Sequence, residues 1–368
     1  MKIKNLLILS LAFLAACKSS VPLETEPITI KGKFANNFYL GTALSLKQIN
    51  ELDSIQSALI AREFNAYTAE NVMKSMHIHP SKDTFNFAAS DRLFDLAKKN
   101  NAVVHGHNLL WHSQLSKFFE EIKDSTEMVA ALTNHIYTIA GRYKGRTLSW
   151  DVVNEAVEGD GSLRKSVFLE VMGAGYLPIV FKLAAAVDPK ADLYYNDYSM
   201  TVPVKKAGVI EMVKNIQAAG AKIDGIGMQG HWHLDSPTIE EIETSILAYS
   251  ALGLKVAITE LDIDVLPRPK NVEGADISQK AEIDILNNPY TAGLPESLVA
   301  AQTQRYKDIF ELFLKHQDKI SRVTFWGVND GDSWKNNFPA KSRTNYPLLF
   351  DRNNKPKLAY DAILSLKD

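Results

Sequence analysis

The sequence contains a single cysteine, Cys17, among its 368 residues. An internal disulfide is therefore excluded, and the stability of the folded chain must come from a large hydrophobic core. The chain also lacks an excess of charge of either sign, because its 41 Lys and Arg residues nearly balance its 43 Asp and Glu residues. No basic patch interleaved with aromatic residues stands out, so the composition gives no sign of nucleic-acid binding.

Several ligand-binding motifs are also missing. The chain has no P-loop pattern, the usual mark of a nucleotide phosphate site, and its one GxGxxG match, Gly225–Gly230, lies within an apolar run that reads as a strand instead of following a strand and opening a helix, as a dinucleotide site requires. His105, His107 and His112 lie close together in the sequence, but they do not form a clear His, Cys and carboxylate zinc pattern. The sequence therefore predicts neither a metal nor an organic cofactor.

The N-terminus has the pattern of an export signal. Met1–Asn5 supplies positive charge, and the apolar run Leu6–Ala16 is too short for a membrane-spanning helix of about 20 residues. Cys17 follows Leu-Ala-Ala directly, which resembles the bacterial lipobox. We expect a signal peptide at 1–16, a lipidated Cys17 and a tether over 17–27, which place the protein on the bacterial outer membrane or cell surface. An ordinary cleavage site is the alternative, with a secreted or periplasmic product.

Short apolar runs alternate with amphipathic stretches along the rest of the chain. The predicted strands are Phe38–Thr42, Glu63–Tyr67, Ala102–Leu109, Thr147–Val153, Asp192–Asn196, Gly225–Gln229, Lys255–Thr259 and Arg322–Gly327. The predicted helices are Ser90–Asn100, Glu127–Tyr143, Ser166–Val187, Lys205–Ala219, Ile239–Leu252 and Ala300–His316. This alternation predicts parallel βα units, and eight of them favour one (β/α)8 TIM barrel over 28–368. A doubly wound open sheet is the alternative, although it often binds through a Gly-rich first loop, and no such loop follows the first predicted strand here.

Two glutamates end buried strands of this predicted barrel. Glu155 follows the apolar run Leu148–Val153, and Glu260 follows Val256–Thr259. A carboxylate in such a position is costly unless it faces a polar cleft. One isolated glutamate there is more often a cap or an ion-pair partner. Two glutamates in matching contexts predict a pair of facing carboxylates. Such a pair is the least that a protein needs to hydrolyse a glycosidic bond.

Polar residues follow most of the other predicted strands too. They are Glu70-Asn71, His105 with His107, Trp111-His112, Asn196-Asp197, Gln229 with His231, Asp262, and Trp326 with Asn329-Asp330. A single cluster of this kind could be capping. Because the carboxyl ends of barrel strands meet at one face, clusters on seven strands predict one shared site.

Several ordered blocks of the chain resemble glycoside hydrolase family 10, whose members are mainly endo-β-1,4-xylanases. The blocks are Glu70–Lys74, Gly106–Gln114, Trp150–Gly161, Tyr195–Tyr198, Gly227–His231, Thr259–Asp262 and Phe325–Asp330. The resemblance covers about Phe38 to Ala359. It implies a retaining mechanism on a (β/α)8 barrel, with Glu155 as acid/base and Glu260 as nucleophile. It also implies xylan or xylo-oligosaccharides as the substrate.

Residues beside the two glutamates are candidates for supporting roles. Asn154 is placed to bind the sugar 2-OH, although capping of the strand end explains it equally well. His231 would contact the nucleophile while Asp262 holds its ring, and Gln229 faces the same side of the strand as His231. Further candidates bind the substrate: Trp111, Trp326, Trp334 and Tyr198 as aromatic surfaces, and Glu70, Asn71, Lys74 and His107 as hydroxyl partners.

The resemblance places the three tryptophans at the glycone subsites, with Trp326 disfavouring sugars that carry a hydroxymethyl group at C5. The chain departs from the family at Ser75, where tryptophan is usual, and at Ser116, Phe118 and Phe119. These departures leave cleft shape and chain-length preference open. A β-1,4-glucanase or mixed-specificity enzyme, and a surface glycan-binding lipoprotein without catalysis, are the alternatives. The loop 266–299 is either a wall of the cleft or an elaborated surface loop.

Overall fold

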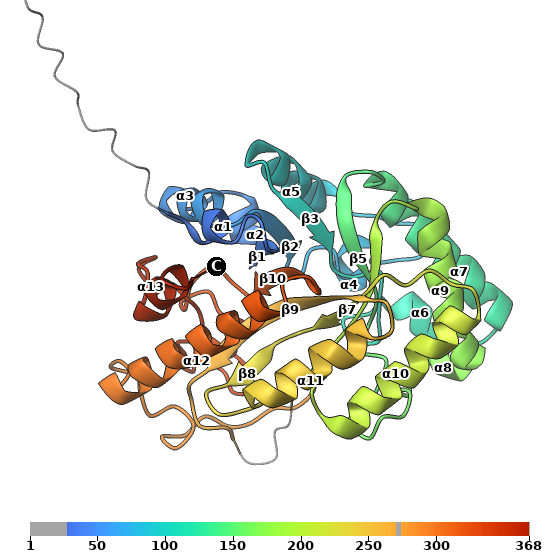
Figure 1. The fold of residues 1–368 in the computed structure, drawn as a ribbon. Helices are drawn as coiled ribbons and strands as arrows, with labels where there is room; N and C mark the ends of the chain where they lie inside the picture. Colours follow the sequence, from blue (N-terminus) through green and yellow to red (C-terminus); the bar gives the residue numbers. More distant parts are fainter. Residues whose placement is uncertain (1–27, 270–273, 368) are drawn as a thin grey trace, which may run out of the picture.

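The computed structural model describes residues 28–269 and 274–367. The predicted signal peptide at 1–16 and the tether with Cys17 at 17–27 lie outside the described residues. The described chain folds into one closed barrel of parallel strands surrounded by helices (Figure 1). The predicted (β/α)8 architecture is therefore confirmed.

Eight parallel strands close the barrel. They are β1 (Tyr39–Leu44), β2 (Ala66–Ala69), β3 (Val103–Gly106), β5 (Thr147–Asn154), β6 (Asp192–Asp197), β7 (Gly225–Met228), β9 (Lys255–Asp264) and β10 (Ile320–Phe325). Each pairs with the next in this order, and β10 pairs with both β9 and β1. Two short strands, β4 (Leu110–Trp111) and β8 (His231–His233), add to β5 and β9 beyond the barrel.

Helices cover the outside of the barrel. The longer ones are α3 (Ser54–Glu63), α5 (Ala88–Lys99), α7 (Ser125–Arg142), α9 (Tyr176–Val187), α10 (Pro203–Ala218), α11 (Ile239–Ser250) and α12 (Glu296–Lys315). The shorter ones are α1 (Ile30–Lys33), α2 (Leu46–Ile49), α4 (Ser75–Ile78), α6 (Lys117–Glu121), α8 (Val167–Met172) and α13 (Leu358–Leu364). Their buried apolar faces join the outward side chains of the strands in one continuous core.

Several predicted boundaries were wrong, and three of them concern the type or the continuity of an element. Glu63 ends α3 instead of starting a strand, and its buried carboxylate accepts hydrogen bonds from the Ile30 amide and the Tyr360 hydroxyl. The strand predicted over Ala102–Leu109 ends at Gly106, since the chain turns before it pairs again as β4. The helix predicted over Ser166–Val187 is broken into α8 and α9 by a 3-10 turn at Gly173–Gly175.

That broken stretch is unusually apolar. Val167–Val187 is long and apolar enough to cross a membrane by length and composition, with a mean hydropathy of 1.6. In the structure α9 packs against α7, β5 and β6, which is the position of a barrel helix. Its composition is therefore explained by packing within this fold.

Both strands that carry the predicted glutamates contain a register shift. On β5 the shift lies between Asp151 and Val153, and on the β9–β10 ladder it lies between Ile258 and Leu261. Such bulges add one residue to a strand and redirect the side chains that follow. The extent of β9 requires a further correction: Glu260 lies within a strand that runs on to Asp264, not after the strand's end.

Candidate active site

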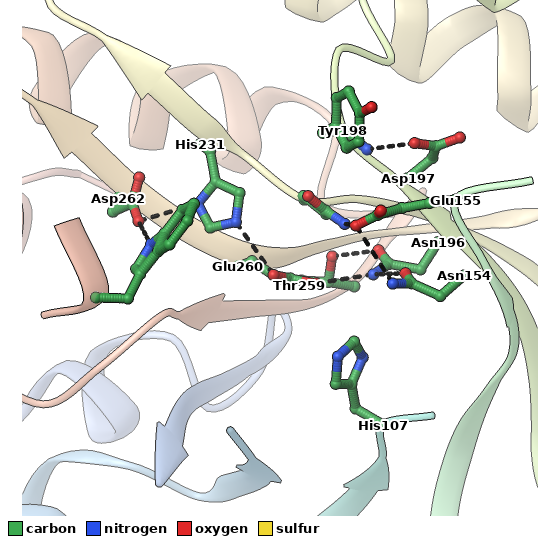
Figure 2. A network of polar contacts seen from close by, with 12 residues as sticks. His107, Asn154, Glu155, Asn196, Asp197, Tyr198, His231, Thr259, Glu260 and Asp262 are labelled. Atoms are coloured by element: carbon green, nitrogen blue, oxygen red, sulfur yellow. Dashed lines mark hydrogen bonds and ion pairs between the residues drawn. The ribbon is translucent and has the colours of Figure 1, made fainter. Parts of the chain in front are cut away.

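Glu155 and Glu260 face one hollow at the carboxyl ends of the barrel strands, and each is about 5% exposed. Gln229 Nε2 donates to Glu155 Oε1 at 2.9 Å, and Asn196 Nδ2 donates to Glu260 Oε1 at 2.9 Å. The side-chain amides of Asn154 and Asn196 are also in contact, so a chain of polar groups joins the two carboxylates (Figure 2). The structure thus brings together the carboxylate pair that the sequence predicts.

The environment of Glu155 favours its protonated form. Burial, together with the nearby charge of Asp197, raises the pKa of Glu155 to about 7, although hydrogen bonds from Gln229 and Trp111 oppose this rise. Trp111 Nε1 donates to Glu155 Oε2 at 2.9 Å. Near neutral pH the carboxyl group of Glu155 can therefore either hold or release a proton.

The backbone of Glu155 is held in an unusual conformation. Its φ is +57°, a value that costs a residue with a side chain about 1 kcal/mol or more. The Glu155 amide donates to the Asn196 carbonyl at 2.9 Å, and Arg164 Nε donates to the Glu155 carbonyl at 2.8 Å. These two contacts fix the turn that aims the carboxyl group into the hollow.

Glu260 has the opposite protonation preference. Burial acts to raise its pKa, but the hydrogen bond from His231 and the nearby positive charges hold the pKa of Glu260 below its usual value. His231 Nε2 lies 3.1 Å from Glu260 Oε2, and His231 Nδ1 lies 2.9 Å from Asp262 Oδ2. Both ring nitrogens face carboxylates, so the imidazolium form is favoured.

Asp262 anchors this arrangement from behind. Burial acts to raise its pKa, but His231, Lys335 and Trp334 hold the pKa of Asp262 below the ordinary range. The pKa of His231 is raised above its usual value because attraction to Asp262 exceeds the penalty of burial. Trp334 Nε1 donates to Asp262 Oδ2 at 2.8 Å. Glu260 is therefore an ionised carboxylate with a fixed orientation.

Most of the predicted substrate-binding residues line the same hollow, which has a volume of about 160 Å³. Its lining includes Glu70, Asn71, Lys74, His107, Trp111, Trp326 and Trp334, together with Asn154, Glu155, Gln229, His231 and Glu260. Lys74 Nζ lies 4.9 Å from the centre of the Trp111 ring and donates to Gln114 and Asn71. Ammonium, carboxyl and indole groups in one small hollow suit a pyranose ring, which has both hydroxyls and apolar faces.

His107 is oriented by a residue that the sequence analysis did not select. Its Nδ1 lies 2.8 Å from Asp151 Oδ2, and its ring meets Trp326 edge to face at 5.3 Å between centres. Figure 2 shows His107 and His231 on opposite sides of Glu260. Gly106, the residue before His107, leaves room for no side chain, because a Cβ at that position would lie 2.1 Å from the Trp150 ring.

The departures from the family pattern lie together beside this hollow. Ser75 Oγ and Ser116 Oγ are 2.8 Å apart, and Ser116 Oγ donates to the His79 carbonyl. The His79 ring packs against both Phe118 and Phe119. A hydrogen-bonded serine pair and an aromatic cluster thus occupy the region where the family usually has tryptophan.

Two further hollows continue the first. One shares His231 and Ala275 with it and is lined by Tyr198, Trp232 and Arg268. Tyr198 therefore lies in this neighbouring hollow and not in the central one. The other shares Ile277 with the central hollow and lies against Phe338. The three adjoining hollows are called the groove below, and described residues of the loop 266–299, between Arg268 and Ile283, line all of them, so this part of the loop forms a wall of the cleft.

Sequence reasoning missed two residues that position the site: Arg164 donates to the Glu155 carbonyl, and Asp151 binds His107. Asn196 was expected at the shared site as one of the polar residues after the strands, but its hydrogen bond to Glu260 was not. Gly227 makes room for Asn196, since a Cβ there would lie 2.3 Å from the Asn196 side-chain oxygen. Within the described part of the chain, no group of three or more His, Cys, Asp or Glu side chains is arranged to hold a metal ion.

Comparisons with known proteins agree with this geometry. Residues 29–366 match the family described as glycosyl hydrolase family 10. A curated relative from Xylanibacter ruminicola, endo-1,4-beta-xylanase A, is 40% identical over 348 residues, which cover 93% of this chain and 94% of the relative.

Solved structures give the same match. A GH10 endoxylanase retrieved from a sugarcane soil metagenome is 44% identical with a TM-score of 0.89, and the match covers 92% of this chain and all of that one. Another, a mutant enzyme in complex with xylotriose, is 33% identical with a TM-score of 0.82, and it covers 92% of this chain and 100% of that chain.

Proposed function

Because the chain belongs to glycosyl hydrolase family 10 and is therefore a glycoside hydrolase, we propose that it is an endo-β-1,4-xylanase. We further propose a retaining double displacement in which Glu155 is the acid/base and Glu260 the nucleophile. The observation that carries the assignment of roles is the opposite protonation preference of two carboxyl groups that face one hollow. A retaining glycosidase needs one protonated and one ionised carboxyl group in its resting state.

In the first step the Glu260 carboxylate attacks the anomeric carbon while Glu155 transfers its proton to the glycosidic oxygen. The carbon–oxygen bond breaks, the shortened chain leaves as an alcohol, and the sugar remains bound to Glu260 as an ester. The charge of Glu260 is thereby consumed. Since that charge helps to raise the pKa of Glu155, the Glu155 pKa falls and its carboxylate becomes a base.

In the second step a water molecule hydrolyses the ester. Glu155 takes a proton from the water while the water oxygen bonds to the anomeric carbon. The bond between that carbon and Glu260 breaks, and Glu260 leaves as a carboxylate. His231 assists both steps by holding Glu260 in place and stabilising its charge. Asn154 touches both the Glu155 carboxyl group and Asn196, and there it is placed to bind the sugar 2-OH.

The shape of the groove favours cleavage inside a chain. Hollows continue past the central one toward Tyr198 on one side and toward Phe338 on the other, so sugar residues can be bound on both sides of the broken bond. Arg164 contacts both the Glu155 carbonyl and the Tyr198 hydroxyl, which places Tyr198 on the proton donor's side. The leaving chain therefore occupies the Tyr198 hollow, and the glycone occupies the hollow with Trp111, Trp326 and Trp334.

We expect Glu260→Ala to lose measurable hydrolysis of arabinoxylan. Glu155→Ala should lose about 10²- to 10⁴-fold on arabinoxylan, since it removes general acid catalysis. It should lose much less on an aryl xylobioside whose leaving group needs little protonation. The measurements are reducing ends released from the polysaccharide and phenolate released from the aryl glycoside. Glu121→Ala, which changes an exposed glutamate on α6, is the matched control.

Full xylanase activity in either active-site variant would overturn the assignment of roles. Proton NMR of the first products tests the mechanism separately, because retention gives the β anomer before mutarotation. Release of reducing ends from carboxymethyl cellulose at a comparable rate would favour a glucanase. An inactive wild type that still binds xylan would instead make the protein a glycan-binding lipoprotein.

A further inference from the structure

The hollow at the Phe338 end of the groove is formed by two segments with no role in the chemistry described above. It has a volume of about 550 Å³ and lies between residues 277–283 of the long loop and residues 337–341. Neither segment belongs to any of the sequence blocks that resemble the family. The residues that form the hollow thus lie outside the motifs that carry the catalytic groups.

The hollow continues the glycone part of the cleft. Ile277 lines both this hollow and the one that contains the two glutamates. The Phe338 ring stacks on the Trp334 ring, with 4.7 Å between centres and 21° between planes. A polysaccharide that lies along Trp334 and extends away from the broken bond would next meet this hollow.

The lining of the hollow carries an excess of positive charge. Lys280 and Lys341 line it and are exposed, and neither forms an ion pair with a carboxylate among the described residues. Glu282 is the single acidic residue in the lining. An anionic substituent is therefore attracted to this end of the groove.

We propose that this hollow is an additional subsite for a sugar that bears a carboxylate, as in a xylan whose backbone carries hexuronic acid branches. The apolar side chains of Ile277, Ile283 and Pro339 offer a surface for a sugar ring, and the two lysines bind its carboxylate. The proposal rests on the proposed xylanase function. It adds that the acidic branch is recognised on the glycone side, beyond Trp334.

The test compares two substrates of equal backbone length, a neutral xylo-oligosaccharide and one with a single hexuronic acid branch. For the double variant Lys280→Ala/Lys341→Ala we expect kcat/KM on the acidic substrate to fall about fivefold, since each exposed pair contributes little. On the neutral substrate it should stay unchanged. Lys280→Glu/Lys341→Glu should lower the acidic rate further. The loss should shrink at about 1 M NaCl, where the screening length is about 3 Å.

Lys98→Ala/Lys214→Ala, which removes two exposed lysines from α5 and α10, is the matched control. Equal effects on both substrates, or no effect on either, would overturn the subsite while leaving the proposed function intact. A wild type that does not cleave the neutral oligosaccharide would instead refute the proposed function. Product mapping gives a second readout: the wild type should leave the acidic branch on the new reducing-end fragment, and the double variant should lose that preference.

Discussion

Trp111 has two effects at the site, one on shape and one on charge. Its indole forms a wall of the central hollow, and its Nε1 donates a hydrogen bond to the Glu155 carboxylate. That hydrogen bond stabilises the ionised form and so lowers the pKa of Glu155. Activity requires Glu155 protonated and Glu260 ionised. The alkaline limb of the wild-type kcat/KM profile should therefore lie near pH 7, and the acid limb below the ordinary glutamate value.

Replacing Trp111 by phenylalanine should shift the alkaline limb to higher pH. The change removes a hydrogen bond that favours the carboxylate, so the pKa of Glu155 rises, by about half a unit for an ordinary bond. The kcat/KM profile on a xylo-oligosaccharide between pH 4 and 9 measures this shift independently of any loss in absolute rate. Trp334→Phe, which loses a hydrogen bond to Asp262 instead, is the control. A limb that stays in place or moves to lower pH would contradict the role of Trp111.

At the scale of residues, the sequence predicts the two carboxylates at the centre of the site and misses some of the residues that only hold other groups in position. Glu155 and Glu260 stand out because a carboxylate after an apolar run is costly. Asn196 is expected at the same face of the barrel, but nothing in the sequence assigns it a partner, and Arg164 carries no signal because an arginine in a loop is ordinary. Their partners, Glu260 and the Glu155 carbonyl, are identified only once the chain has folded.

At the scale of elements, the break between α8 and α9 gives a test with a built-in control. Gly173 has φ 63° and ψ −174°, a conformation that is almost restricted to glycine, whereas Gly175 has φ −62° and ψ −14°. A Cβ at either position would have no atom within 4 Å. Gly173→Ala should therefore lower the free energy of unfolding by about 1–3 kcal/mol from backbone strain alone. Gly175→Ala should leave it unchanged or raise it by up to about 1 kcal/mol.

Midpoints of urea unfolding, followed by circular dichroism for wild type and both variants, measure this difference. Equal midpoints for the two variants would show that the 3-10 turn does not impose the conformation of Gly173. Xylanase activity below the transition should stay unchanged in both, because neither glycine reaches the groove described above.

The broken helix also shows how far element prediction can go. Ser166–Val187 keeps an apolar character throughout, and three residues of turn are too few to interrupt that pattern. The bulges on β5 and β9 are equally invisible in the sequence, because one inserted residue leaves both strands apolar. The bulge on β9 lies between Ile258 and Leu261 and so contains Glu260, which faces the cleft although its strand continues to Asp264.

At the scale of the whole molecule, we propose that the chain is exported and anchored by a lipid on Cys17. Cys17→Ala should release the protein from the membrane fraction, and xylanase activity should follow the protein into the soluble fraction without loss per molecule. Fractionation of cells with an antibody against the barrel measures the distribution. Lys18→Ala, which keeps the cysteine, is the control. Unchanged partitioning of the Cys17 variant would refute the anchor.

The barrel itself is the part of the molecule that the sequence predicts best. Eight apolar runs separated by helical patterns leave few arrangements that bury all of them. Which loop would shape the cleft was not predictable from the sequence. The loop 266–299 has little periodicity and many prolines, and residues 277–283 of this loop share a hollow with residues 337–341, a segment that comes much later in the chain.

The pairing that closes the barrel sets the order in which the protein can mature. β1 near the start of the chain pairs with β10 near its end, so the ring of strands has an open edge on β1 and on β9 until Ile320–Phe325 is available. Contacts so distant in sequence make folding slow, and no disulfide can hold a partial barrel together. A chain that stops before residue 320 contains both glutamates, but its β1 and β9 have unpaired edges, which are templates for aggregation. Synthesis must therefore be nearly complete before either glutamate can act.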